Sequence, residues 1–222
     1  MTIKEKTKDN LRQFDIGNKL PPLPVLPRAS VLIPLFVRNG QLYTLLTLRS
    51  KELRTSAGEV CFPGGKRDPS DKDDIDTALR EAEEEIGLHP DDVEVVCTLF
   101  PIINKSGLLV TPVVSFIEES FRPSPNPAEV SAVFTVPLDF FIKKESHRAA
   151  HNAPWTAGPV HFFHYKDPES ENQFHIWGLT AALAIIVAAC ALRRDPEFDV
   201  GFSTEDPSSF FQQMLYRRLS KL

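Results

Sequence analysis

The sequence predicts an α+β or α/β fold in which helices cover a mixed, partly antiparallel sheet. Three observations support this prediction: apolar segments flank Asn39-Gly40, a helical stretch rich in acids covers residues 72–86, and further strand patterns precede two late helices. Strand pairs interspersed with single helices are typical of layered architectures. A chain of 222 residues is long enough for one domain with a substantial core, and two full domains are not expected.

The first 28 residues are polar and end in the proline-rich run PPLPVLPR. Proline fixes φ and lacks an amide donor, so this run favours an extended arm or linker. We therefore expect an arm over residues 1–28, a folded domain over residues 29–215 and a tail over residues 216–222.

The segments on either side of Asn39-Gly40 are apolar and β-branched, and this dipeptide is a strong short-range signal for a β-hairpin. The glycine-rich loop GEVCFPGGKRDP then leads into the helix expected over residues 72–86, with Ser70 or Asp71 as its N-cap. Gly87 is expected to end this helix, because glycine adopts the left-handed conformation without strain.

The second half of the chain carries strand patterns and then two helical stretches. We expect strands at 93–99, 108–116 and 133–136, a second hairpin over 160–165 and 173–177, and helices over 179–192 and about 207–219. The apolar run at 179–192 is too short to cross a bilayer of roughly 30 Å. It predicts a buried core helix, and no membrane span is expected.

Composition excludes some function classes. The formal net charge of −5, from 25 basic and 30 acidic residues, argues against general nucleic-acid binding, which normally needs a basic surplus. Cys61, Cys97 and Cys190 lack metal-finger spacing and are expected to be reduced and buried. The six histidines show neither zinc nor triad spacing, so structural roles are expected for them.

The end of the predicted 72–86 helix is the most informative segment. At roughly 100° per residue, Glu81, Glu84 and Glu85 share an arc of about 100° and form one acidic face. The apolar Ala82 and Ile86 fall on another face, which is expected to pack on the core. Like charges at these spacings destabilise a helix by roughly 0.2–0.5 kcal/mol per pair, so a neutralising partner is expected.

Two interpretations of this acidic face are open. It is either a solvated helix surface or a set of oxygen ligands for Mg²⁺ or Mn²⁺, which accept carboxylates and keep positions for water and phosphate. The loop before the helix favours the metal, because Gly64 and Gly65 offer backbone that a phosphate or cation can approach closely.

The segment from Gly65 to Leu88 resembles the Nudix box, G-x5-E-x7-R-E-U-x-E-E-x-G-U, where U is a bulky aliphatic residue. The second half of the box matches closely, with Ala82 at one U position. Gly65 and Arg80 are fifteen residues apart rather than fourteen, and Asp71 or Lys72 stands where the early glutamate would align. The resemblance implies a Nudix-type α/β/α sandwich.

The extra residue is shared with the coenzyme A branch of the Nudix family. That branch's signature, L-L-T-x-R-S-x3-R-x3-G-x3-F-P-G-G, is matched at every fixed position from Leu45 to Gly65. The segments 126–130 and 176–181 also resemble this branch. With its final tripeptide, the chain is similar to the peroxisomal coenzyme A diphosphatases of animals.

The resemblance implies roles for the acids. Glu81 and Glu85 would hold the metal, and Glu84 would add a ligand or accept a proton from metal-bound water. Arg80 would orient the glutamates, although a surface arginine paired with Glu84 remains an alternative. Glu129, in a proline-rich loop, is the candidate for the additional glutamate that many Nudix enzymes use.

The resemblance also implies a substrate, coenzyme A or acyl-CoA, cleaved to 3′,5′-ADP and 4′-phosphopantetheine or its acylated form. A site for the 3′-phosphate needs fixed positive charge. Arg49 and Arg54 lead by their place in the branch signature, and Lys66 and Arg67 follow. The backbone of Gly64 and Gly65 would approach the diphosphate.

Ser220-Lys221-Leu222 matches a peroxisomal targeting tripeptide, which an import receptor reads. We therefore expect a peroxisomal enzyme with that receptor as a partner. Two alternatives stay open: a Nudix hydrolase of another nucleoside diphosphate derivative such as ADP-ribose or NADH, and a catalytically silent module that binds CoA.

Overall fold

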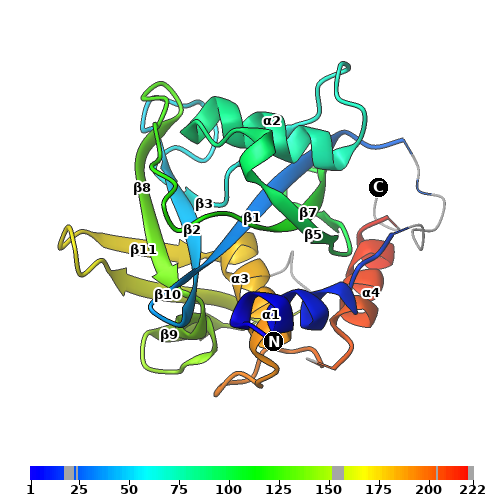
Figure 1. Ribbon diagram of the computed structural model, residues 1–222. Helices are drawn as coiled ribbons and strands as arrows, with labels where there is room; N and C mark the ends of the chain where they lie inside the picture. The colour runs from blue at the N-terminus through cyan, green and yellow to red at the C-terminus, as the bar shows by residue number, and fades with distance from the viewer. Residues whose placement is uncertain (18–22, 24, 152–157, 204, 220–222) are drawn as a thin grey trace.

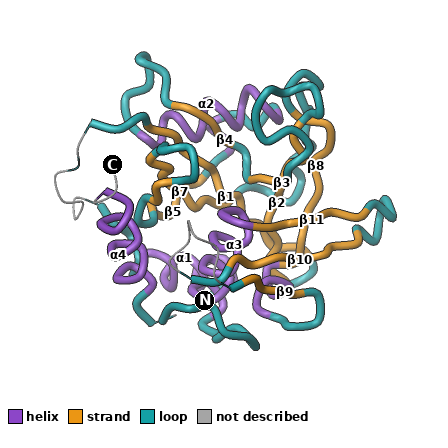
Figure 2. Tube along the Cα trace, turned by 180° about the vertical axis from the view of Figure 1, so that it is seen from behind, coloured by secondary structure: helices purple, strands orange, loops and turns teal. Residues whose placement is uncertain are grey.

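The computed structural model describes residues 1–17, 23, 25–151, 158–203 and 205–219 (Figure 1). Two β-sheets lie between a helix on one side and a group of helices on the other. Helix α2 (Asp74–Ile86) covers one side, whereas α1, α3 and α4 lie on the opposite side, as both views show (Figures 1 and 2). This arrangement confirms the predicted α/β/α layers.

The predicted first hairpin is confirmed. Strands β1 (Arg28–Arg38) and β2 (Gln41–Arg49) pair antiparallel, with Arg38 opposite Gln41. The two turn residues, Asn39 and Gly40, both have positive φ, at 50° and 74°. Such a turn matches the right-handed twist of the flanking strands, which is why Asn-Gly predicts it.

The larger sheet has the order β3-β2-β1-β7-β5, and β4, β6 and β8 pair with β1, β7 and β2 respectively. Strands β1 and β7 run parallel, whereas the other pairs are antiparallel, so the sheet is mixed as predicted. The remaining strands of this sheet are β3 (Val60–Cys61), β4 (Gly64–Lys66), β5 (Glu94–Thr98), β6 (Ile102–Ile103), β7 (Leu109–Phe116) and β8 (Val130–Pro137).

A second, three-stranded sheet contains the other predicted hairpin. Its order is β11-β10-β9, formed by β9 (His147–Ala150), β10 (Val160–Lys166) and β11 (Gln173–Trp177). Alternate residues of β10 are buried, and Phe174 of β11 stacks on Phe134 of β8 with ring centroids 3.7 Å apart. This stacking joins the second sheet to the first.

Strand β1 supplies both layers of the core. Leu32 and Phe36 face α2, together with Ala82 and Ile86. Ile33 and Leu35 face the opposite layer, which contains α3 (Gly178–Leu192). Alternation along a strand places successive side chains on opposite faces, so one apolar strand can serve two helical layers.

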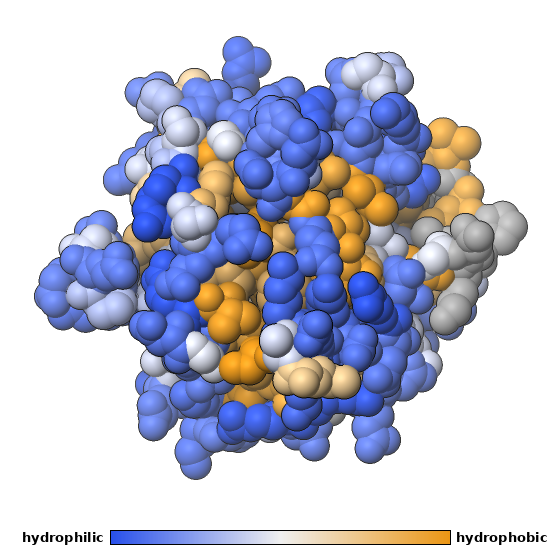
Figure 3. All heavy atoms as spheres, viewed as in Figure 1, coloured by the Kyte–Doolittle hydropathy of each residue, from blue (hydrophilic) through white to orange (hydrophobic). Residues whose placement is uncertain are grey.

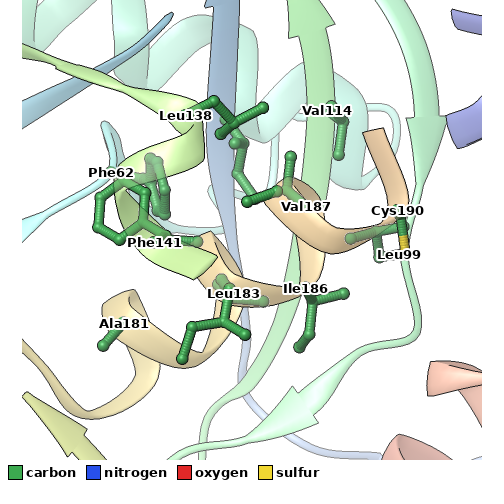
Figure 4. Close-up of a cluster of buried hydrophobic side chains, with 14 of the residues drawn as sticks. Phe62, Leu99, Val114, Leu138, Phe141, Ala181, Leu183, Ile186, Val187 and Cys190 are labelled. Atoms are coloured by element: carbon green, nitrogen blue, oxygen red, sulfur yellow. The ribbon is translucent and has the colours of Figure 1, made fainter. Parts of the chain in front are cut away.

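Helix α3 is apolar all round and buried, as the sequence predicts. Figure 4 shows Leu183, Ile186 and Val187 of this helix in one apolar cluster with Phe62 and Phe141.

Polar residues cover most of the molecular surface seen in Figure 3, and apolar residues gather towards the middle of that view. Within the described part of the chain, no helix is long and apolar enough to cross a membrane. The remaining helical elements are the 3-10 helices η1 (Pro90–Asp92) and η2 (Leu138–Ile142), and helix α4 (Pro207–Leu219).

The start of α2 differs from the prediction. The helix begins at Asp74, and its N-cap is Asp73, whose carboxylate accepts a hydrogen bond from the Asp76 amide at 2.8 Å. Neither Ser70 nor Asp71 caps it, because Asp71 is turned towards Arg80 instead. The predicted end is confirmed, since Gly87 is left-handed with φ of 70°.

The expected extended arm over residues 1–28 is wrong for its first part. Residues Ile3–Arg12 form helix α1, opened by a capping box between Thr2 and Glu5. Leu11 is fully buried in the core, and the Asp15 carboxylate accepts a hydrogen bond from the Thr98 amide of β5. The fold therefore includes residues before Ala29, the expected boundary. Residues 18–22 and 24 of the predicted arm lie outside the described residues.

Helix α1 should depend on one apolar anchor. Leu11→Ala removes a fully buried side chain and should cost about 2–5 kcal/mol of unfolding free energy, as large-to-small core substitutions do. Ile3→Ala in the same helix removes a side chain that is 43% exposed and should cost less than about 0.5 kcal/mol. Urea unfolding of both variants measures this, and equal costs would contradict the docking of α1.

Candidate active site

The acid-rich end of α2 lies directly against the backbone of β4. The Gly64 amide donates a hydrogen bond to Glu85 Oε2 at 3.1 Å. A Cβ placed on Gly65 would stand only 2.4 Å from Glu81 Oε2, and one on Gly64 would stand 2.3 Å from the Ser30 carbonyl oxygen. Gly64 is therefore required by the backbone of β1, whereas a side chain at Gly65 would displace the carboxylate of Glu81.

Burial makes these carboxylates costly to ionise. Glu85 is 1% exposed, and this burial raises its pKa from 4.5 to about 7, against the lowering by the Gly64 amide and Arg49. Burial also raises the pKa of Glu81, although Arg80 opposes that shift. A divalent cation held between the two groups would stabilise their charged forms.

Glu84 departs from the predicted three-carboxylate face. Its side chain is about half exposed, and Oε2 accepts a hydrogen bond from Arg80 Nη1 at 3.1 Å. Among the residues that the structure describes, no three acidic, histidine or cysteine side chains converge as a ready metal site. Magnesium suits one or two carboxylates completed by water and substrate phosphate, so Glu81, Glu85 and nearby backbone carbonyls fit that cation.

Arg80 joins the helix to the loop before it. Its guanidinium donates two hydrogen bonds to the Asp71 carboxylate, at 2.8 and 3.0 Å, and one to the Lys66 carbonyl oxygen at 3.0 Å. It also lies 3.0 Å from Glu81 Oε1. These bonds hold the pKa of Asp71 well below its usual range. Arg80 therefore makes the contacts expected from both interpretations. It pairs with Glu84 as a surface arginine would, and it also contacts Asp71 and Glu81 as an orienting residue would.

Sequence reasoning missed the importance of Asp71. It was considered as an N-cap or as a substitute for the early glutamate of the box, but it is the buried partner of Arg80 and also accepts from Thr77 Oγ1 at 2.9 Å. The only sequence signal was an acid nine residues before the arginine, within a loop whose path cannot be read from spacing.

Glu129 is brought to the acidic pair by its loop. The side-chain amide of Asn126 donates a hydrogen bond to Glu129 Oε1 at 3.3 Å. The backbone amide of Asn126 donates to the Glu85 carbonyl oxygen at 2.9 Å. The charge of Glu129 raises the pKa of both Glu81 and Glu85, so it stands within electrostatic reach of them. Two other acids that follow β7 pair with cations instead: Glu118 is 3.8 Å from Lys4, and Glu119 is 3.4 Å from Arg38.

The four predicted phosphate-binding cations do not gather in one place. Arg49 lies at the site, with Nη1 3.8 Å from Glu85 Oε1. Arg67 is engaged by the N-terminal end of α2, where it donates to the carbonyls of Asp71 and Lys72 and lies 3.7 Å from Asp74. Arg54 and Lys66 have exposed side chains. Only Arg49 of the four lines the cavity beside the glycines.

That cavity has a volume of about 410 Å³ and begins at Arg49, Gly64 and Gly65. It continues between the sheet and helices α3 and α4, and most of its wall is apolar. Lys105 and Trp177, which sequence reasoning missed, also line it, with Lys105 Nζ 5.6 Å from the Trp177 ring centroid. Lys105 and Trp177 are 72 positions apart in the sequence, so no local pattern indicates their proximity.

A family model described as the NUDIX domain matches residues 26–157 of the chain. The chain belongs to the Nudix family. The match spans the strands β1, β2, β4 and β7, helix α2 and the loop that carries Glu129, so the predicted Nudix resemblance is confirmed.

Curated Nudix proteins are similar to the chain over most of its length. It is 44% identical to the peroxisomal coenzyme A diphosphatase NUDT7 of Mus musculus, over 91% of the chain and 86% of the mouse protein. It is 42% identical to Nudix hydrolase 22, chloroplastic, of Arabidopsis thaliana, over 89% of the chain and 67% of that protein. It is 45% identical to Nudix hydrolase 15, mitochondrial, of the same plant, over 77% of the chain and 61% of that protein.

Of the described histidines and cysteines, His161 and Cys61 line the cavity of this Nudix fold. His147 and His161 share a hydrogen bond of 2.9 Å, and burial lowers the pKa of His147 to about 4. All three thiols are unpaired. Burial raises the pKa of Cys97 and Cys190 to about 12, as expected for inert core residues.

The raised pKa of Glu85 gives a pH test. The folded protein keeps a proton on Glu85 that the unfolded chain releases, so metal-free stability should fall as the pH rises from 4.5 through about 7. Glu85→Gln cannot ionise, and it should gain up to about 3 kcal/mol relative to the original chain between pH 5 and pH 8. Urea unfolding with a chelator measures both curves. Parallel curves would show that Glu85 ionises normally.

Proposed function

We propose that the chain is a metal-dependent diphosphatase of coenzyme A and acyl-CoA, releasing 3′,5′-ADP and 4′-phosphopantetheine or its acylated form. The observation that supports it best is the position of Glu81 and Glu85, which contact Gly64 and Gly65, two glycines that also line an apolar cavity. The name of the mouse relative, a peroxisomal coenzyme A diphosphatase, favours this substrate within the family.

The proposed cofactor is Mg²⁺ or Mn²⁺, held by Glu81 and Glu85 with a backbone carbonyl near Gly65. When bound, such an ion neutralises phosphate charge and lowers the pKa of a bound water. Glu84 is half exposed at the edge of the site, where it would add a ligand or accept a proton from that water. This exchange requires Glu84 to leave its contact with Arg80.

Arg80 and Glu129 have distinct proposed roles. The bonds of Arg80 to Asp71 fix a guanidinium that also contacts Glu81, so Arg80 would position the ligands without touching the substrate. Glu129 comes from a separate loop and lies within electrostatic reach of the acidic pair. It would serve as the additional glutamate that orients or deprotonates the attacking water.

The nucleotide half of the substrate needs cations outside the apolar cavity. Arg49 stands nearest to the diphosphate position, because it already contacts Glu85. Arg54, between β2 and β3, and Lys66, at the end of β4, have exposed side chains and are the candidates for the 3′-phosphate. The bonds of Arg67 to the carbonyls of Asp71 and Lys72, just before α2, leave it a weaker candidate than its sequence position implies.

The proposed compartment is the peroxisome, reached through an import receptor that reads Ser220-Lys221-Leu222. This tripeptide lies outside the described residues. The name of the mouse relative favours the peroxisome, whereas those of the two plant relatives give the chloroplast and the mitochondrion. The family by itself therefore does not fix the compartment, and the proposal depends on the tripeptide.

Glu81→Gln should reduce kcat with coenzyme A by at least about 100-fold, because it removes a charged metal ligand at the reacting centre. Glu83→Gln is the matched control, since Glu83 is exposed on another face of α2 and lies near His89. Initial rates with Mg²⁺ and with Mn²⁺, together with thermal unfolding, separate lost chemistry from lost fold. Equal rates in a folded Glu81→Gln protein would end the proposed mechanism.

Substrate comparison separates the proposed activity from other Nudix reactions. Coenzyme A should be hydrolysed with a kcat/KM at least about tenfold above that for dephospho-CoA, because one charge-assisted contact to the 3′-phosphate is worth roughly 1.5–3 kcal/mol. Mass spectrometry of the products identifies the bond that is cut. Preference for NADH or ADP-ribose would favour the alternative Nudix hydrolase, and binding without turnover would favour a silent CoA-binding module.

A further inference from the structure

The apolar cavity has a volume in the range of small-molecule sites, and it reaches the two glycines that contact the acidic pair. Gly64 and Gly65 line it, and the same two glycines face the Glu85 and Glu81 carboxylates. A diphosphate held beside these glycines carries two substituents. We expect one of the two to extend into the cavity.

The charges along the wall decide which substituent enters. Within the described residues, Arg49 and Lys105 are the cations that line the cavity. Arg49 is 3.8 Å from Glu85, and Lys105 is 64% exposed and 3.9 Å from Glu59, so each already faces a carboxylate. A nucleotide 3′-phosphate enclosed by the apolar side chains of the wall would lose its hydration, which is costly. The uncharged pantetheine arm and an acyl chain carry no such cost.

The C-terminal helix contributes aromatic side chains to the wall. Phe210 and Phe211 of α4 line the cavity together with Phe202, and their ring centroids lie 5.2 Å (Phe202–Phe210) and 5.5 Å (Phe210–Phe211) apart. Phe211 is 3% exposed and anchors the helix, whereas Phe210 is only partly buried. Ala182 of α3 is a small residue that also lines the cavity.

We propose that this cavity binds the acyl-pantetheine half of the substrate and that Phe210 of α4 limits the length of the acyl chain. This inference rests on the proposed function and adds a specificity determinant to it. The residue comes from a helix beyond the matched Nudix segment, which ends at residue 157. Helix α4 would therefore limit which acyl chains are accepted, although the proposed metal ligands all lie in the matched Nudix segment.

The test is a series of acyl-CoA substrates with chains of two to fourteen carbons, with free coenzyme A as the reference. For the original chain, kcat/KM relative to coenzyme A should rise up to about fourfold per methylene until the cavity is filled, and then level off or fall. Phe210→Ala should move this maximum to chains at least two carbons longer. Ala182→Leu should move it to shorter chains.

Phe140→Ala is the matched control, because Phe140 is also partly buried among aromatic rings but does not line the cavity. It should leave the chain-length profile unchanged. Calorimetric titration with decanoyl-CoA in a chelator adds a readout without turnover, and Ala182→Leu should weaken that binding while affecting coenzyme A less.

The outcomes distinguish the two proposals. If coenzyme A is hydrolysed but Phe210→Ala and Ala182→Leu both keep the original profile, the acyl site is wrong and the proposed function stands. If coenzyme A is not hydrolysed by the folded original chain with either metal, the proposed function itself fails, and the acyl inference fails with it.

Discussion

The contact between two buried carboxylates and a backbone without side chains is the constraint on which the site depends. Glu85 is nearly inaccessible and accepts from the Gly64 amide, while Glu81 fills the space that a Gly65 side chain would need. Burial opposes the charge of both acids. A fold that maintains such a pair without compensation loses stability, and a divalent cation would provide that compensation. The glycines, the helix and the sheet register are thus parts of one arrangement.

The scaffold keeps this pair in place through contacts from both directions. Strand β4 pairs with β1 opposite Ser30 and Val31, which fixes the glycines against the sheet. Arg80 ties the helix to the preceding loop through Asp71, and Asn126 ties the Glu129 loop to the end of α2. Charge-assisted bonds of this kind are strong and directional. The acids are therefore held by three segments whose positions depend on one another.

The cavity extends this site into the layer on the other side of the sheet. Its wall combines β6, α3, the end of β11 and α4, so it depends on elements after the acid helix. Strand β1 separates the α2 layer from the α3 layer, and the short strand β4 pairs with β1 in the same sheet. The proposed substrate has a matching division. Its charged diphosphate would lie beside the proposed metal ligands, and its apolar half would lie along the aromatic wall.

Local patterns in the sequence determined the hairpins, the acid helix and its glycine end, and the buried helix α3, since each rests on backbone propensity or periodicity over a few residues. Helix geometry also placed Glu81 and Glu85 on one face of α2. Only the tertiary structure decided the contact of these acids with Gly64 and Gly65, the docking of α1 through Leu11, the pairing of Asp71 with Arg80, the contact of Glu84 with Arg80, and the cavity lined by Lys105, Trp177 and Phe210. Each of these depends on contacts between segments distant in the chain or on a choice of rotamer, and neither leaves a periodic signal in sequence.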